Sequence, residues 1–200
     1  MSTFDTRAKE WEKGDKGNIR VQNAKTIAEA IKRKIILDRS MEIIDFGVGT
    51  GLLGYEIAKE VKKVYGIDTS SKMLEEIKAK NTKELFIEPI HKDLTQEKCS
   101  LHVNGIVSSM TLHHIENVYS LFERFYEMLD DNGFIAFADL CSEDGTFHSD
   151  NTGVHHFGFE KEFLFDILKK IGYKDLDFQI INTIKKPHRY FDLFLLTARK

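Results

Sequence analysis

The chain has 200 residues, of which 42% are hydrophobic and 30% charged, a balance that suits one globular domain with a full core. Its formal net charge of -3 argues against a general attraction to nucleic acid or to an anionic membrane. No run approaches the roughly 18 apolar residues of a membrane span, and the polar first ten residues do not read as a secretory signal. We expect a single domain over residues 1–200. The two cysteines are far apart in the sequence, so we expect no disulfide and a location in the reducing cytoplasm.

Hydrophobic periodicity predicts helices that alternate with short strands. In chain order we expect a helix at 23–33, a strand at 41–46, a helix at 52–60, a strand at 64–67, a helix at 71–80, strands at 85–90 and 105–109, a helix at 118–129, a strand at 133–140, a helix at 159–171, and strands at 176–181 and 191–198. Ser70 or Ser71 is expected to cap the helix at 71–80, and Gly172 to end the helix at 159–171. Residues 130–133 are expected to form a turn, and Phe159, Phe163 and Phe165 are expected in the core. This alternation predicts an α/β fold with a doubly wound, mostly parallel sheet.

A glycine-rich turn follows the first expected strand. Residues 43–54 read Ile-Ile-Asp-Phe-Gly-Val-Gly-Thr-Gly-Leu-Leu-Gly. Glycines let a backbone turn sharply and approach a ligand, and the helix start that follows offers unpaired N–H groups. Gly49 to Gly54 also match the G-x-G-x-x-G pattern, so an NAD- or FAD-dependent oxidoreductase is one interpretation.

Asp45 argues against a dinucleotide. It stands two residues before the first glycine, where its carboxylate would repel a pyrophosphate. S-adenosylmethionine carries no phosphate, and its sulfonium and ammonium groups are attracted by a nearby carboxylate. Its own carboxylate can accept hydrogen bonds from the N–H groups of the turn. The residues therefore favour S-adenosylmethionine as the cofactor.

The same segment resembles the acidic-x-Gly-x-Gly-x-Gly motif of class I S-adenosylmethionine-dependent methyltransferases of the small-molecule type. This resemblance implies a seven-stranded Rossmann-like sheet with an antiparallel last strand. It also implies that Asp68, after the second strand, holds the two ribose hydroxyls, a task that suits a carboxylate because it accepts two hydrogen bonds. The cofactor-binding residues that it implies are Asp45, Gly47, Gly49, Gly51, Asp68, Thr69, Met73, Asp93, Leu94 and Ser109.

Two parts of the resemblance leave a structural alternative open. Asp93 falls where the family accepts a hydrogen bond from the adenine amino group, but an Asp after a strand is also a common helix cap. Phe4 and Trp11 resemble the aromatic opening of small-molecule members. They either close over the cofactor or only fix the N-terminal segment in place.

The acceptor side is expected beyond the carboxyl ends of the strands. Residues 1–33 are predicted to form a helical lid, and the long, polar, histidine-rich segment 142–158 a substrate-side loop. Methyl transfer depends mainly on alignment, so no catalytic residue is required. His113 or His114 is a candidate for proton transfer, and His155 or His156 for substrate contact, although histidines also occur as polar packing residues.

No metal site is predicted. His148, His155, His156 and Cys141 fit no standard ligand spacing. The expected function is in-line methyl transfer from S-adenosylmethionine to a small molecule, without a nucleic-acid partner because basic charge is low. A non-catalytic cofactor-binding or scaffold protein with the same fold is the alternative. Neither the methyl acceptor nor the oligomeric state follows from the sequence.

Overall fold

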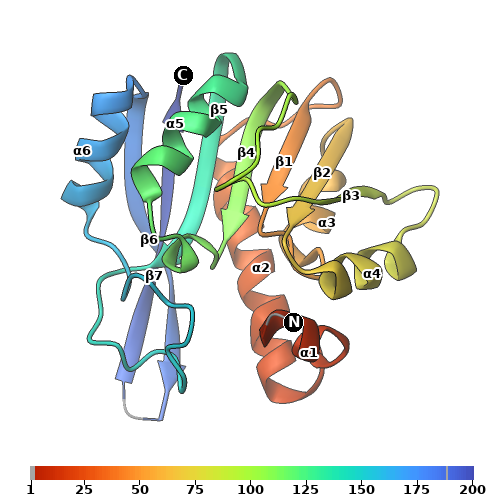
Figure 1. The fold of residues 1–200 in the computed structure, drawn as a ribbon, viewed down its shortest axis with the longest axis vertical. Helices are drawn as coiled ribbons and strands as arrows, with labels where there is room; N and C mark the ends of the chain where they lie inside the picture. The colour runs from red at the N-terminus through yellow and green to blue at the C-terminus, as the bar shows by residue number, and fades with distance from the viewer. Residues whose placement is uncertain (1–2, 188) are drawn as a thin grey trace.

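The computed structural model describes residues 3–187 and 189–200 and contains a seven-stranded sheet in the order β3-β2-β1-β4-β5-β7-β6 (Figure 1). The strands are β1 (Glu42–Phe46), β2 (Lys63–Asp68), β3 (Ile87–His91), β4 (Val103–Ser109), β5 (Leu129–Leu140), β6 (Lys174–Lys186) and β7 (Arg189–Arg199). The first five strands are parallel to one another, and β7 is antiparallel to both β5 and β6. The predicted sheet with an antiparallel last strand is confirmed.

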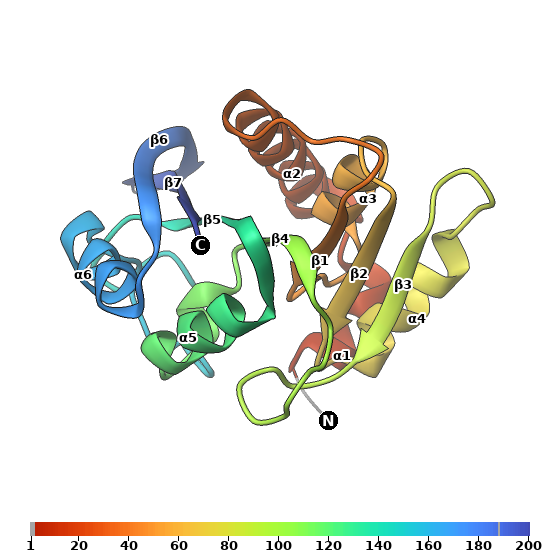
Figure 2. The same cartoon turned by 90° about the horizontal axis from the view of Figure 1, so that it is seen from above.

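Helices cover both faces of the sheet (Figure 2). They are α1 (Thr3–Arg7), η1 (Ala8–Glu10), α2 (Gly14–Lys34), α3 (Leu52–Ala58), α4 (Ser71–Lys80), η2 (Leu112–His114), α5 (Val118–Met128) and α6 (Lys161–Ile171). One buried cluster joins α2, α3 and α4 to strand residues such as Ile43, and the other joins α5 and α6 to residues such as Ile44. Because successive strand side chains point to opposite faces, a sheet buried on both sides needs apolar residues at nearly every position. Over the described residues, no helix is long and apolar enough to cross a membrane.

The ends of several helices follow local chemistry that the sequence predicted. The hydroxyl of Ser70 caps α4 by accepting a hydrogen bond from Met73 N at 3.2 Å. Gly172 ends α6 in the left-handed conformation, with φ 115°. The helix expected at 23–33 begins earlier, at Gly14, because tertiary contacts support its polar first half. There Arg20 lies 3.9 Å above the Trp11 ring and donates a hydrogen bond to the Trp11 carbonyl.

The prediction that Phe163 belongs to the core is wrong. The last helix begins at Lys161, two residues later than expected, and it turns Leu164 inward instead. Phe163 is 46% exposed, whereas Phe159 is buried as predicted and Phe165 is partly buried. The buried stripe of α6 is Leu164, Ile167 and Leu168, and Phe163 lies at the edge of that stripe.

The last three strands, β5, β6 and β7, extend furthest beyond their predicted bounds. β5 begins at Leu129, which pairs with Val103, so the expected turn at 130–133 lies within the strand as an irregularity with Asn132 at φ 62°. The β6–β7 hairpin continues beyond the sheet, as Figure 1 shows. Its extension adds a third small core with Phe147, which supports the loop that follows β5. These extensions depend on pairing between distant segments, which local periodicity does not report.

Candidate functional site

The glycine turn after β1 forms one side of the candidate site. Gly47, Gly49 and Gly51 all have positive φ, at 66°, 53° and 88°, a conformation that costs other residues energy. A side chain at Gly47 would collide with Thr111, but one at Gly49 would meet nothing within 4 Å. Gly47 is thus required by packing, whereas Gly49 leaves open space against which a ligand can lie.

Asp68 joins the ends of β1 and β2. Its Oδ2 accepts a hydrogen bond from Gly49 N at 2.8 Å, and its Oδ1 accepts one from Ser70 N at 2.8 Å. Burial raises the pKa of Asp68, although these backbone N–H groups act in the opposite direction. The Asp68 carboxylate therefore lies at the end of the second strand, where the sequence placed it. It accepts hydrogen bonds that hold the glycine turn in its conformation.

Asp45 lies enclosed beside the start of α3. It is 2% exposed, its Oδ2 has no hydrogen-bond partner, and that atom would be 2.8 Å from a side chain at Gly54. Burial, followed by the charge of Asp68, raises the pKa of Asp45 to about 8. The carboxyl group accepts a hydrogen bond from the Gly54 backbone, so only Oδ2 is without a partner. A buried polar atom without a partner is costly unless a ligand compensates it, which fits a site that receives a cation nearby.

The other predicted cofactor residues lie along the same edge, because the order β3-β2-β1-β4 aligns the carboxyl ends of these strands. Thr69 is exposed after β2, Met73 is buried at the start of α4, and Ser109 is partly buried at the end of β4. Leu94 is fully buried, next to Asp93.

Asp93 stabilises a turn after β3, and it does not form the helix cap that was the structural alternative, because no helix follows it among the described residues before β4. Its Oδ1 accepts hydrogen bonds from the backbone N and the hydroxyl of Thr95, at 2.8 and 2.6 Å. These contacts stabilise the turn after β3. An adenine contact for this residue stays a prediction.

The N-terminal segment crosses this edge of the sheet (Figure 1). Asp5 accepts a hydrogen bond from the Ser70 hydroxyl at 2.6 Å. Glu12 accepts hydrogen bonds from the Thr50 hydroxyl in the glycine turn and from the Lys80 ammonium group. The segment is thus held over the cofactor turn by side chains on two sides.

Phe4 links this segment to a group of histidines. Its ring centroid lies 6.0 Å from that of Trp11 and 5.3 Å from that of His114. The aromatic opening therefore fixes the segment in place and also reaches the acceptor side of the site.

His113 is the buried centre of that side. It is 1% exposed, and its Nδ1–H donates a hydrogen bond to Asp139 Oδ1 at 2.7 Å, which leaves Nε2 without a partner. Burial raises the pKa of Asp139, but the charge and hydrogen bond of His113 outweigh this and hold it below its usual value. His113 is therefore oriented by a carboxylate, with one nitrogen free.

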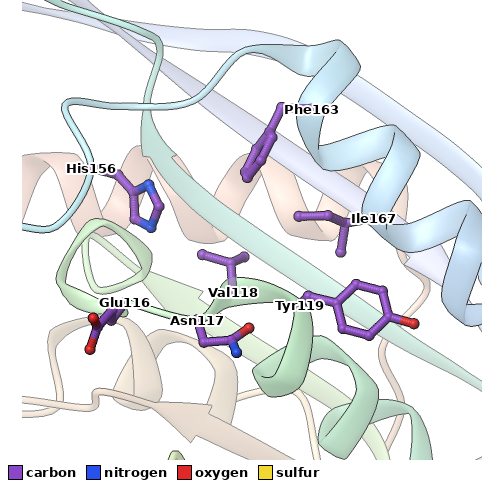
Figure 3. Close-up of a pocket in the computed structure, with 7 residues that line it drawn as sticks. All are labelled: Glu116, Asn117, Val118, Tyr119, His156, Phe163 and Ile167. Atoms are coloured by element: carbon purple, nitrogen blue, oxygen red, sulfur yellow. The ribbon is translucent and has the colours of Figure 1, made fainter.

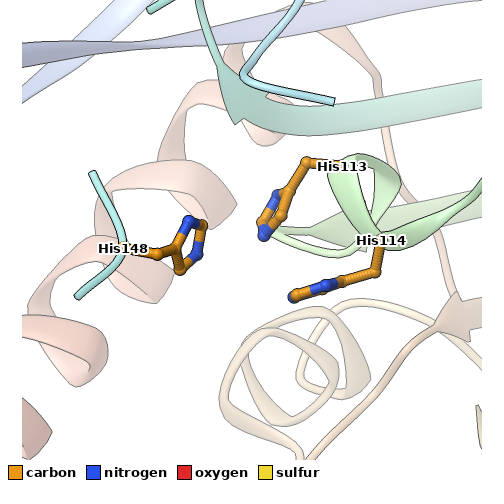
Figure 4. A group of neighbouring side chains, drawn as sticks. All are labelled: His113, His114 and His148. Carbon is orange, nitrogen blue, oxygen red and sulfur yellow. The ribbon is translucent and has the colours of Figure 1, made fainter. Parts of the chain in front are cut away.

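His114 and His148 complete a group with His113 (Figure 4). The ligand atoms of the three rings lie within 4.8 Å of one another, and the centroids of His113 and His148 are 4.9 Å apart. Burial lowers the pKa of His114, and burial together with the neighbouring histidines lowers the pKa of His148 to about 4. Both rings are neutral at physiological pH. The sequence indicated His148 only as one of several loop histidines, because it lies 34 residues away from His114.

The other two candidate histidines act mainly through their backbone. His155 N and His156 N both donate hydrogen bonds to the His113 carbonyl, at 2.9 and 3.1 Å, so they attach the loop to η2. The His155 side chain is exposed, and His156 Nε2 donates to the Ile115 carbonyl at 3.0 Å. Neither belongs to the buried group, and neither does Cys141, whose pKa burial raises to about 11.

His156 also borders a separate pocket on the α5–α6 side of the molecule (Figure 3). The pocket has a volume of about 600 Å³ and is lined by Glu116, Asn117, Val118, Tyr119, His156, Phe163 and Ile167. The exposure of Phe163 is thus explained by its place at this pocket.

Comparison with known proteins identifies the family. A family model described as a methyltransferase domain matches residues 17–186. The chain belongs to the class I S-adenosylmethionine-dependent methyltransferases. Membership of this family indicates S-adenosylmethionine rather than a dinucleotide as the cofactor.

The curated relatives of this methyltransferase match only part of its sequence. An uncharacterized methyltransferase of Schizosaccharomyces pombe is 28% identical over 148 residues, which are 64% of this chain and 52% of that protein. The chain spans about half the length of the curated relatives it matches.

Two solved structures share the fold at low identity. A methyltransferase from Haloferax volcanii, in complex with the activator Trm112, has a TM-score of 0.75 and 13% identity, covering 100% of this chain and 98% of that one. Phosphoethanolamine N-methyltransferase 2 of Haemonchus contortus, in complex with S-adenosylmethionine, has a TM-score of 0.72 and 14% identity, covering 100% and 60%.

Proposed function

We propose that this methyltransferase transfers the methyl group of S-adenosylmethionine in line to a small-molecule acceptor. The observation that carries this proposal is that two segments of the chain cover the edge formed by the carboxyl ends of the strands. Phe4 of the N-terminal segment packs on His114, and the loop at 142–158 is attached to the carbonyl of the neighbouring His113. An edge covered by the chain's own segments suits an acceptor that fits beneath them.

We therefore assign the substrate-side loop to residues 142–158 within a single domain over residues 1–200. Of the lid expected at residues 1–33, the segment before α2 is proposed to cover the edge, because Ile27 and Ile31 of α2 are buried in the core against the sheet. The structure describes the lid from residue 3 onward. Closure of such segments excludes water and fixes the acceptor against the methyl group. The extended β6–β7 hairpin supports the loop, since the Phe147 and Phe191 rings lie 5.2 Å apart.

The cofactor would be held by the residues along the β1–β4 edge. The open space at Gly49, the Asp68 carboxylate and the unpartnered Oδ2 of Asp45 fit an adenosyl donor that carries positive charge. The proposed binding residues are Asp45, Gly47, Gly49, Gly51, Asp68, Thr69, Met73, Asp93, Leu94 and Ser109. Bound there, S-adenosylmethionine supplies an activated methyl carbon whose bond to sulfur breaks as the bond to the acceptor forms.

The chain's own contribution is alignment and the exclusion of water. Positioning alone supplies up to about 7–11 kcal/mol in favourable cases, so no base is needed unless the acceptor must lose a proton. Of the three candidate histidines, the buried His113 is the one whose free nitrogen lies on the acceptor side. A cytoplasmic location is also proposed, which the two free cysteines support.

Calorimetry with S-adenosylmethionine and S-adenosylhomocysteine tests the cofactor site. Asp68→Ala should weaken binding by about 30–100-fold, because a carboxylate that accepts two hydrogen bonds is lost. The matched control is Asp166→Ala on the exposed face of α6, which should bind as the parent does. Equal affinity of Asp68→Ala and the parent would contradict the assignment.

A second assay tests the class of acceptor. Release of S-adenosylhomocysteine should be stimulated by fractions of small metabolites and not by RNA or by folded proteins. Stimulation by RNA or protein alone would refute a small-molecule acceptor while leaving the cofactor site intact.

A further inference from the structure

Two of the three grouped histidines are held so that one ring nitrogen remains free to bind a ligand. His113 Nδ1–H donates to Asp139, and His114 Nδ1–H donates to the Gly153 carbonyl at 2.7 Å. A ring that donates through Nδ1 in its neutral form presents a lone pair at Nε2. Metal-binding histidines are oriented in this way, by a carboxylate or a backbone carbonyl behind the ring.

The free nitrogens are buried and without partners. His113 Nε2 and His148 Nδ1 have no hydrogen-bond partner, and the His113 side chain is only 2% exposed. A buried lone pair without a partner is costly and indicates a missing ligand. Because Asp139 accepts from His113, the group has a negative charge behind it that favours a cation.

We propose that His113, His114 and His148 bind a divalent transition-metal ion, with Zn²⁺ as the best fit. Imidazole nitrogen is a preferred ligand of Zn²⁺, Co²⁺ and Ni²⁺, whereas Mg²⁺ and Ca²⁺ take oxygen ligands. Zn²⁺ binds imidazole nitrogen at about 2.0–2.1 Å, so the three rings must move closer than their present separations of up to 4.8 Å. His148 lies on the loop after β5 and can supply that movement.

The arrangement is that of an open site. Structural zinc sites use four protein ligands, while three leave a position for another molecule. The group stands after β4 and β5, and Thr111 of the same turn contacts Gly47 of the cofactor edge. The metal would therefore lie next to the acceptor side. This proposal departs from the sequence prediction of no metal, and it does not depend on which acceptor is used.

Titration of the metal-free, untagged full-length chain with Zn²⁺ against a chromogenic chelator tests the proposal. We expect one Zn²⁺ per chain, a Co²⁺ complex with visible absorption bands, and no competition by Mg²⁺. His148→Ala should weaken Zn²⁺ binding at least tenfold, because it removes one of three ligands.

The matched control is His155→Ala, which removes an exposed histidine from the same loop and should bind Zn²⁺ as the parent does. Binding of S-adenosylmethionine should be unchanged in His148→Ala, so failure of the metal site and failure of the cofactor site are distinguishable. Substoichiometric binding in the parent, or equal affinities for His148→Ala and His155→Ala, would overturn the proposal.

Discussion

The cofactor turn and the histidine group lie at the same edge of the sheet but are built in different ways. The turn from Gly47 to Gly51 is one continuous segment whose shape is set by backbone conformation. The histidine group joins η2 to a loop that follows the next strand, and side chains make its contacts. The comparison shows that neighbouring residues in the chain specify the glycine turn, whereas the histidine group forms only after β4 and β5 have paired.

The largest expected effect is on stability, and it distinguishes a glycine needed for packing from a glycine that leaves space for a ligand. Gly47→Ala should lower the free energy of unfolding by about 3–5 kcal/mol, because it adds left-handed strain and a collision with Thr111. Gly49→Ala has the strain without the collision and should cost only about 1–2 kcal/mol. Urea denaturation measures both variants.

The same pair also reports on the ligand. Gly49→Ala should lose S-adenosylmethionine affinity although it folds, because its methyl group enters the space left for the cofactor. If Gly49→Ala bound the cofactor as tightly as the parent, the glycine turn would not be part of the cofactor-binding site.

The second effect is a pH dependence of the free energy of unfolding, and it originates from Asp45. The folded-state pKa of Asp45, about 8, lies above the ordinary value of 3.8, so the folded protein keeps a proton that the unfolded chain releases. Its contribution to the free energy of unfolding therefore falls as pH rises from about 4 to 8 and stays low above pH 8.

Asp45→Asn removes this group without changing its size. The stability of the variant relative to the parent should increase by about 2–4 kcal/mol between pH 5 and pH 8. Thermal or urea unfolding across that range, with Asp166→Asn as the exposed control, measures it. A pH-independent difference would show that Asp45 is ionised in the folded protein.

A third effect concerns the histidine group. Asp139→Asn keeps the shape of the side chain but loses a charged acceptor, and should destabilise the protein by about 1–3 kcal/mol. The affinity for S-adenosylmethionine should not change, since the hydrogen bonds of Asp139 go to His113 and to the Leu140 backbone. A parallel loss of cofactor affinity would show that the two regions are coupled.

The smallest effect tests the lid. Glu12→Gln weakens a half-exposed contact to Lys80 and Thr50 and should cost less than about 1 kcal/mol of stability. Cofactor dissociation should become a few-fold faster, because the lid opens more often. Stopped-flow measurement of release compares it with Glu10→Gln, a nearby exposed residue. Equal rates for the two variants would argue against a lid.

Much of the fold followed from local pattern. The strand at β1, the helix at α4 with its Ser70 cap, and the end of α6 at Gly172 were predicted from periodicity and capping. The glycine turn was predicted from neighbouring residues, since they encode backbone conformation, whereas the role of Asp68 was implied by the resemblance to the family. The placement of Phe163 failed because the packing of α6 buries the stripe of Leu164, Ile167 and Leu168, an orientation that periodicity does not fix to within one residue.

By itself, the sequence determined the sheet, the glycine turn and the choice of a methyl donor over a dinucleotide, because each depends on residues that are neighbours in the chain. Only the tertiary structure decided that His148 meets His113 and His114, that Asp139 lies behind His113, and that Asp45 is enclosed. These contacts arise from strand order and from a hairpin that extends beyond the sheet, and no spacing along the chain records them.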